Sequence, residues 1–212
     1  MTSYTEQEEL DKLKVWWKNY GNSLIFGVIM GMVALFGFRY WSHQKEQNLV
    51  AASVLYDQMV QSLRTSNLNA AMKTGDTLIT EYASTPYAAM AALLHARVDY
   101  EAGDATAARK NLQWVIDHAK DSGATHSARL RLARLHVNSG EMDAALALAN
   151  VKDQTGFEVE YQELKGDILS AQGHRDEARV AYREALKHLP SGSPYLPVLT
   201  MKLDDLGPEK AL

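Results

Sequence analysis

Cysteine is absent from this chain of 212 residues, and proline is rare, with only 5. The lack of cysteine excludes disulfide bonds, thiol nucleophiles and metal sites with thiolate ligands. The chain also lacks an excess of positive charge, since its formal net charge is −4, and this argues against a nucleic-acid-binding domain. Scarce proline, frequent alanine and the absence of β-branched runs predict helix throughout.

Motifs that carry catalysis or bind cofactors are also missing. The 7 histidines form no HExxH motif, and the sequence contains no GxSxG, GxGxxG or GxxxxGK[ST] pattern. We therefore predict no enzyme, no catalytic, cofactor-binding or metal-ligating residue, and no small-molecule substrate. Surface or partly buried positions in ordinary helices account for the histidines, which are His43, His95, His118, His126, His136, His174 and His188.

One long hydrophobic run is present. It extends without interruption from Leu24 to Phe38, and aromatic residues bracket it between Tyr20 and Trp41. A helix over 20–41 is about 33 Å long at about 1.5 Å per residue, which matches a hydrocarbon core of about 30 Å. Since Tyr and Trp favour the headgroup level, we predict a single transmembrane helix over these residues.

A cleaved signal peptide and a buried helix of a soluble protein are the alternatives. A leader of mixed charge and the bulky residues from Phe38 to Trp41 do not fit a signal peptide with an Ala-x-Ala cleavage site. No other segment is apolar enough to surround a helix that is hydrophobic on all sides. We therefore predict an uncleaved signal anchor.

Gly27 and Gly31 form a GxxxG motif inside this segment. Small residues at this spacing let two helices approach closely in lipid. The pattern is also common in membrane helices that do not pair through it. A role of Gly27 and Gly31 in helix packing is therefore one prediction, and ordinary glycine content is the alternative.

The charges that flank the span indicate its orientation only weakly. Lys12, Lys14 and Lys18 precede it, and Arg39 and Lys45 follow it. By the positive-inside rule, this small difference favours a cytoplasmic N-terminus. The predicted parts are residues 1–19 in the cytoplasm, 20–41 in the membrane, and 42–212 as one domain on the other side, which is the periplasm in a bacterium.

Helical stretches separated by short turns make up the rest of the chain. Glycines are expected at most of the turns, whereas Gly75 is expected inside a helix. The turn glycines are Gly103, Gly123, Gly140, Gly156, Gly173 and Gly192. The expected helices are Leu49–Arg64, Leu68–Tyr82, Pro86–Glu101, Ala105–Lys120, His126–Ser139, Met142–Asn150, Glu158–Gln172, Arg175–Leu189 and Tyr195–Leu206.

Three of these turns share one pattern, in which a glycine is followed five residues later by an alanine. The three glycines lie 37 and 33 residues apart, close to the ~34-residue period of tetratricopeptide repeats. The glycine is expected to end the first helix of each pair in a left-handed conformation. The alanine lets the second helix pack closely on the first. The pairs are Gly103 with Ala108, Gly140 with Ala145, and Gly173 with Ala178.

The last of these units resembles a tetratricopeptide repeat most closely. Gly166 stands at the small position of the first helix, which Ala96 and Ala133 hold in the earlier units. Stacked helix pairs bury each other's apolar faces, so we predict an all-α helical solenoid with a capping helix at Tyr195–Leu206. The aromatic, small and proline positions that follow Gly173 are filled by Tyr182, Ala185 and Pro190.

The first helices of the pairs are expected to line a groove for a peptide or a partner helix. With the Gly173 unit as the reference, Arg97 and Arg134 occupy equivalent positions. Arginines at one end and carboxylates at the other would orient a bound peptide, and solvated helix positions are the alternative. The predicted protein-binding residues are Arg97, Tyr100, Arg134, Asn138, Glu163 and Asp167.

The whole chain resembles the YfgM family, ancillary subunits of the SecYEG translocon in Gram-negative bacteria. The resemblance is most specific around the membrane segment, in Trp17–Gly21, Gly27–Gly31 and Gly37–Gln44, and it extends to Leu130–Arg134 and Met201–Leu203. It implies a single-pass inner-membrane protein with a periplasmic repeat domain and no catalytic residues. It also implies association with SecYEG and with the chaperone PpiD, and help in passing translocated polypeptides to periplasmic chaperones.

Two other functions are alternatives at this point. A tethered scaffold for another envelope assembly complex would show a different dominant partner on crosslinking. A membrane-bound hydrolase would show a turnover that is lost when one of the histidines is replaced. The translocon is favoured because a tether beside the channel keeps a binding domain at high local concentration, where weak contacts suffice.

Overall fold

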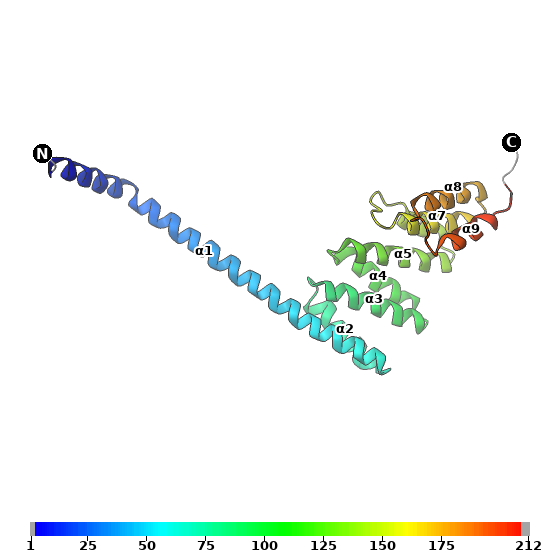
Figure 1. The fold of residues 1–212 in the computed structure, drawn as a ribbon. Helices are drawn as coiled ribbons and strands as arrows, with labels where there is room; N and C mark the ends of the chain where they lie inside the picture. Colours follow the sequence, from blue (N-terminus) through cyan, green and yellow to red (C-terminus); the bar gives the residue numbers. More distant parts are fainter. Residues whose placement is uncertain (1–2, 209–212) are drawn as a thin grey trace. The chain divides into compact units, whose positions relative to one another are not determined.

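The computed structural model describes residues 3–208, apart from the side chains of residues 3–9, 13, 22–24 and 28. Within this range it contains nine α-helices and no strand (Figure 1), which confirms the predicted all-α class. The chain divides into two compact units, Met1–Ala51 and Ala52–Leu212. The helices are α1 (Ser3–Arg64), α2 (Leu68–Glu81), α3 (Pro86–Glu101), α4 (Ala105–His118), α5 (Ser122–Asn138), α6 (Met142–Ala149), α7 (Glu158–Ala171), α8 (Arg175–His188) and α9 (Leu196–Asp204).

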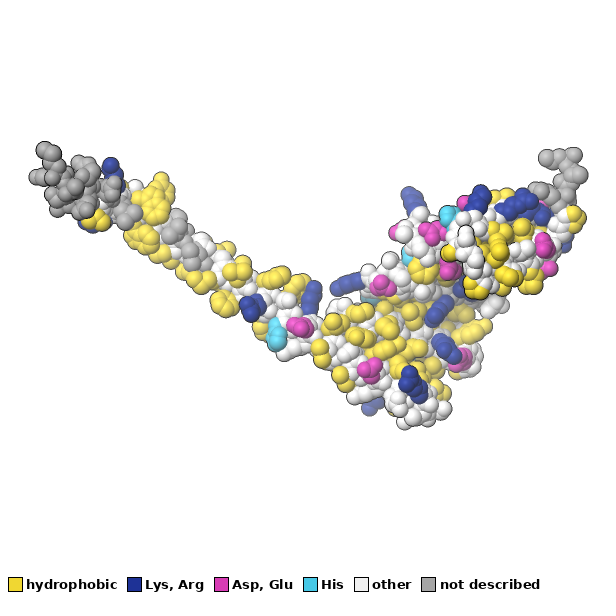
Figure 2. Space-filling model, viewed as in Figure 1, with side chains coloured by type: hydrophobic (Ala, Val, Ile, Leu, Met, Phe, Trp, Pro, Cys, Tyr) yellow, Lys and Arg dark blue, Asp and Glu magenta, His cyan; other side chains and the backbone are white. Residues whose placement is uncertain are grey.

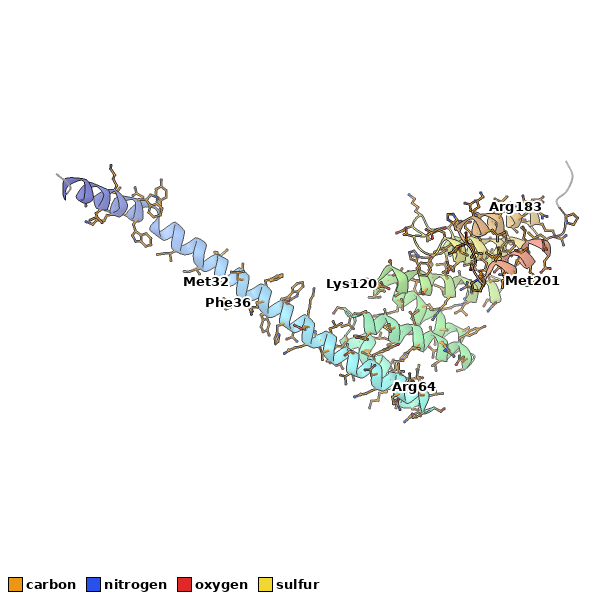
Figure 3. All side chains as sticks on the ribbon, viewed as in Figure 1. Met32, Phe36, Arg64, Lys120, Arg183 and Met201 are labelled. Carbon is orange, nitrogen blue, oxygen red and sulfur yellow. The ribbon has the colours of Figure 1, made fainter. Side chains whose placement is uncertain are left out.

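The first unit is formed by the N-terminal part of α1. A segment that begins at Ile25 is long and apolar enough to cross a membrane, judged by length and composition. Figure 2 shows hydrophobic side chains along this part of the helix, with Lys and Arg side chains on either side of them. Met32 and Phe36, one turn apart, project outward and are 50% and 72% exposed (Figure 3). Such a surface is favourable in lipid and unfavourable in water.

One boundary differs from the sequence prediction. The membrane segment and the helix Leu49–Arg64 were expected as separate stretches, but both belong to the unbroken α1. The physical reason is that no glycine or proline lies between Arg39 and Arg64 to end the helix. The helix ends just before Ser66, which has a φ of 58°. The predicted domain boundary between residues 41 and 42 stays a prediction.

The second unit contains three antiparallel helix pairs, α3 with α4, α5 with α6, and α7 with α8 (Figure 1). The first helix of each pair ends at a glycine with a φ between 76° and 86°, which confirms the predicted left-handed turns. In each turn a backbone N–H donates to the carbonyl five residues earlier. These bonds are Asp104 to Asp99 at 2.8 Å, Glu141 to His136 at 2.9 Å, and His174 to Leu169 at 2.8 Å.

Small residues lie where the paired helices touch. The second-helix alanines Ala108, Ala145 and Ala178 are all fully buried, as predicted. In the first helix of the last pair, Gly166 leaves no room for a side chain, because an added Cβ atom would lie 2.5 Å from the ring of Tyr182. Close helix contact at these points therefore depends on side-chain size.

The hydrophobic core runs through the unit as four clusters, each shared by consecutive helices. The first joins the end of α1 to α2 and α3 through buried Ala52, Met59 and Leu78. The next two join α3, α4 and α5, and then α5, α6 and α7. In the last cluster Leu199 of α9 is fully buried against α7 and α8. This arrangement confirms a helical solenoid, and α9 packs against its last helix pair.

The start of α5 corrects a second expectation. Gly123 was predicted at a turn, and the helix was predicted to begin at His126, but α5 begins at Ser122. The Asp121 carboxylate accepts a hydrogen bond from the Ala124 N–H at 2.7 Å and acts as the N-cap. This cap outweighs the low helix propensity of Gly123.

Candidate functional site

The helices α3, α4 and α5 line a pocket of about 400 Å³. Its apolar lining consists of Leu93 and Ala96 from α3, Leu112 from α4, and Leu135 from α5. The volume lies in the range of about 300–1,000 Å³ that is typical of ligand sites. A pocket of this size and lining suits an aliphatic side chain of a partner.

Polar side chains from α3 and α5 surround this apolar floor. Four of the six predicted groove residues lie here together, namely Arg97, Tyr100, Arg134 and Asn138. The Asn138 amide donates to the Tyr100 hydroxyl at 3.2 Å and joins the two helices. Arg131, which is not among the predicted groove residues, lines the pocket as well. Its position three residues before Arg134 on the same helix face is the signal that could have identified it.

The three arginines of the pocket differ in their partners. The Arg97 Nε donates to the Glu101 carboxylate at 2.7 Å, within the same helix. Among the described residues, no carboxylate pairs with Arg131 or Arg134, and no acidic side chain lines the pocket. The pocket therefore combines an apolar floor with positive charge that is not neutralised inside the chain.

Glu163 and Asp167 lie on α7 and face the capping helix instead of the arginines. The Lys202 Nζ lies 2.6 Å from Glu163 Oε1 and 2.7 Å from Asp167 Oδ2. The Tyr195 hydroxyl donates to Glu163 at 2.6 Å, and the Tyr182 hydroxyl donates to Asp167 at 2.7 Å. Both carboxylates are thus satisfied within the chain, and their predicted role in binding a partner stays a prediction.

The protonation of this second cluster follows from the same contacts. Burial alone would lower the pKa of Lys202, but hydrogen bonds to Asp167 and Glu163 outweigh burial and raise that pKa. Burial is the larger cause and the hydrogen bond to Asp167 the next, and together they raise the pKa of Tyr182 far above its ordinary value. Lys202 therefore remains charged and Tyr182 neutral at any physiological pH.

Two histidines of the second unit, His95 and His126, are buried and make packing contacts. His126 Nδ1 lies 2.9 Å from the Tyr161 hydroxyl in the core, and His95 is buried against Gly75, where an added Cβ atom would lie 2.0 Å from Nε2. In the described part of the chain, no three His, Asp or Glu side chains are placed to hold a metal ion. The absence of a cofactor stays a prediction.

In the membrane segment, Gly27 and Gly31 leave open space. A Cβ atom added at either position would meet nothing within 4 Å. The surface over these two glycines is thus available for another helix, and their role in packing stays a prediction.

Comparison with known proteins agrees with this architecture. The family described as tetratricopeptide repeat-like domain matches residues 14–208. A protein of Neisseria gonorrhoeae named ancillary SecYEG translocon subunit is 32% identical over 205 residues, which cover 95% of this chain and 97% of that protein. Proteins of the same name from Haemophilus influenzae and Escherichia coli are 30% and 26% identical, over 86% of this chain and 89% and 87% of their own lengths.

These matches include both the apolar helix and the repeats, so they concern the whole architecture and not the repeat alone. The chain therefore belongs to the YfgM family of ancillary SecYEG translocon subunits, with a tetratricopeptide repeat-like domain.

Proposed function

We propose that the protein is a non-enzymatic ancillary subunit of the SecYEG translocon in the inner membrane. Residues 1–19 lie in the cytoplasm, residues 20–41 cross the membrane, and residues 42–212 lie in the periplasm. The repeat domain binds the chaperone PpiD and helps to pass translocated polypeptides to periplasmic chaperones. The observation that carries the proposal is the match to relatives named as translocon subunits over nearly the full length of both chains.

The geometry supports a binding role for the repeat domain. The pocket between α3, α4 and α5 offers apolar surface and uncompensated positive charge at one place. Both are features of a site that recognises a polypeptide segment. The apolar helix provides the tether, and a tethered site needs only weak contacts to be occupied beside the channel exit.

Copurification after mild crosslinking tests the proposal. The full-length protein with an affinity tag is crosslinked in intact cells of a Gram-negative host, solubilised in detergent and isolated. We expect SecYEG components and PpiD in the isolated complex. A different dominant partner, for example a cell-division or outer-membrane assembly complex, would contradict the proposal and identify the protein as another kind of scaffold.

A further inference from the structure

The capping helix α9 shows how this solenoid holds a segment against a first helix. Leu199 of α9 is fully buried among apolar residues of α7 and α8. Three residues later, Lys202 binds the α7 carboxylates Glu163 and Asp167. One leucine and, about one helical turn later, one lysine whose charge is opposite to that of the α7 carboxylates thus hold α9 in place.

The same repeat position carries the opposite charge in the earlier repeats. Asp167 follows the small residue Gly166, as Arg97 follows Ala96 and Arg134 follows Ala133. The surface over α7 is therefore acidic and covered by α9, whereas the surface over α3 and α5 is basic. On that basic surface, the described residues leave a pocket of about 400 Å³.

The sign of the charge is the feature that selects an occupant. The chain as a whole has a net charge of −4, but the charged side chains that line the pocket are all arginines, Arg97, Arg131 and Arg134. Within the described part of the chain, Arg131 and Arg134 have no carboxylate partner. Arginine pairs strongly with carboxylates because its planar fork of donors matches their geometry.

We propose that this pocket binds a segment of a partner polypeptide in which an acidic side chain lies about one helical turn from a bulky aliphatic one. The aliphatic side chain enters the apolar floor formed by Leu93, Leu112 and Leu135, and the carboxylate binds Arg131 and Arg134. The segment occupies the first-helix surface as α9 does over α7, with the charges reversed. The inference rests on the proposed function in one respect, namely that the partner is a polypeptide.

Binding of two matched peptides to the purified full-length protein in detergent micelles tests the proposal. The synthetic, fluorescently labelled peptides share one helix-forming sequence and differ at a single position, three residues after a leucine, which is glutamate in one and lysine in the other. Fluorescence anisotropy is expected to show about tenfold tighter binding of the glutamate peptide, and a smaller difference at high salt.

Two variants separate the pocket from general electrostatic attraction. The double variant Arg131→Gln/Arg134→Gln is expected to bind both peptides equally. The control Arg175→Gln removes an exposed positive charge at the start of α8 and should keep the preference for glutamate. Circular dichroism and thermal unfolding of each variant check that the fold is intact, and both substituted arginines are exposed.

Equal binding of the two peptides to the unmodified protein would overturn the proposal. A preference for glutamate that persists in the double variant would overturn it too, because residues other than Arg131 and Arg134 would then recognise the charge. The proposed function is tested separately by copurification with SecYEG, which needs no peptide. If SecYEG copurifies and the peptides bind equally, only the inference on the pocket fails.

Discussion

At the scale of single residues, the size of one side chain decides how closely two helices pack. Gly166 of α7 is an example, because the ring of Tyr182 occupies the space into which a Cβ atom would project. Tyr182 is itself held by its hydrogen bond to Asp167, so the ring cannot move away without losing that bond. The sequence pattern predicted a small residue at this position, but not which aromatic side chain fills the space.

Replacement of Gly166 by alanine is expected to destabilise the protein. Overpacking of a core costs about 1–3 kcal/mol, and the gain in helix propensity from glycine to alanine offsets about 1 kcal/mol of this cost, so we expect a net loss of up to about 2 kcal/mol. Chemical unfolding of the full-length protein in detergent measures it. In a Tyr182→Ala background, where the ring is absent, the same substitution should be neutral or stabilising. An equal cost in both backgrounds would show that Tyr182 is not the cause.

His95 gives a second prediction at this scale, which concerns how the free energy of unfolding depends on pH. Burial lowers the pKa of His95, and the carboxylates of Asp76 and Asp99 only partly oppose this effect. In the unfolded chain the pKa is about 6.5. Below that pH the unfolded state binds more protons than the folded state, so the free energy of unfolding should decrease as the pH falls from about 6.5 to the folded-state pKa.

Urea unfolding at pH 7.5, 6.5 and 5.5 measures this decrease. The variant His95→Gln has no titrating group at that position, so its stability should depend less on pH over the same range. If the unmodified protein and the variant lose the same stability between pH 6.5 and 5.5, His95 does not titrate as the structure implies.

At the scale of helices, local sequence signals determine most boundaries. The glycines after α3, α5 and α7 and the buried alanines that follow them were predictable because turn conformation and close packing restrict these positions to few residue types. Gly123 was misassigned because the cap at Asp121 is a stronger signal than glycine in a first helical turn. The continuity of α1 was not predicted because the apolar run that ends at Phe38 differs in composition from the stretch after it, although no glycine or proline separates the two.

The candidate site was predictable only in part, for a related reason. Arg97, Tyr100, Arg134 and Asn138 meet in one pocket because they hold similar positions in adjacent repeats, and repeat periodicity can be seen in a sequence. The partner of Glu163 and Asp167 is Lys202, more than thirty residues later in the chain. No local pattern indicates which way the capping helix lies, so this contact could not be predicted.

Replacement of Lys202 by methionine is expected to loosen α9. Glu163 is only 5% exposed, and a buried carboxylate without its partner costs at least about 1–3 kcal/mol. The matched control is Lys187→Met, because Lys187 pairs with Glu184 on an exposed face and such pairs contribute about 0–1 kcal/mol. Hydrogen exchange of α9 amides should increase in the first variant and not in the second. Equal protection in both would show that the Lys202 contacts do not hold the helix.

At the scale of the whole molecule, one apolar helix and one repeat domain define the protein. The apolar segment is long and apolar enough to cross a membrane, and the helix pairs form a tetratricopeptide repeat-like domain without a recognisable catalytic motif in the sequence. Under the proposed function, the first unit fixes the location and the second selects a partner. The absence of cysteine from the whole chain makes the topology directly measurable.

Single cysteines introduced at Ser3 and at exposed Thr106 of α4 test the proposed orientation. In cells with an opened outer membrane and an intact inner membrane, a membrane-impermeant maleimide should label Thr106→Cys and not Ser3→Cys. Permeabilisation of the inner membrane should then allow labelling of Ser3→Cys. The reverse pattern would place the repeat domain in the cytoplasm.

The most direct test of the account is photo-crosslinking from the pocket in living cells. A photoreactive phenylalanine analogue replaces Tyr100 in the pocket, and a control carries it at Val180, which is 65% exposed on α8. We expect adducts with PpiD or translocating polypeptides from position 100 that are absent from position 180, in a complex that contains SecYEG. Identical adducts from both positions, or a complex without SecYEG, would contradict it.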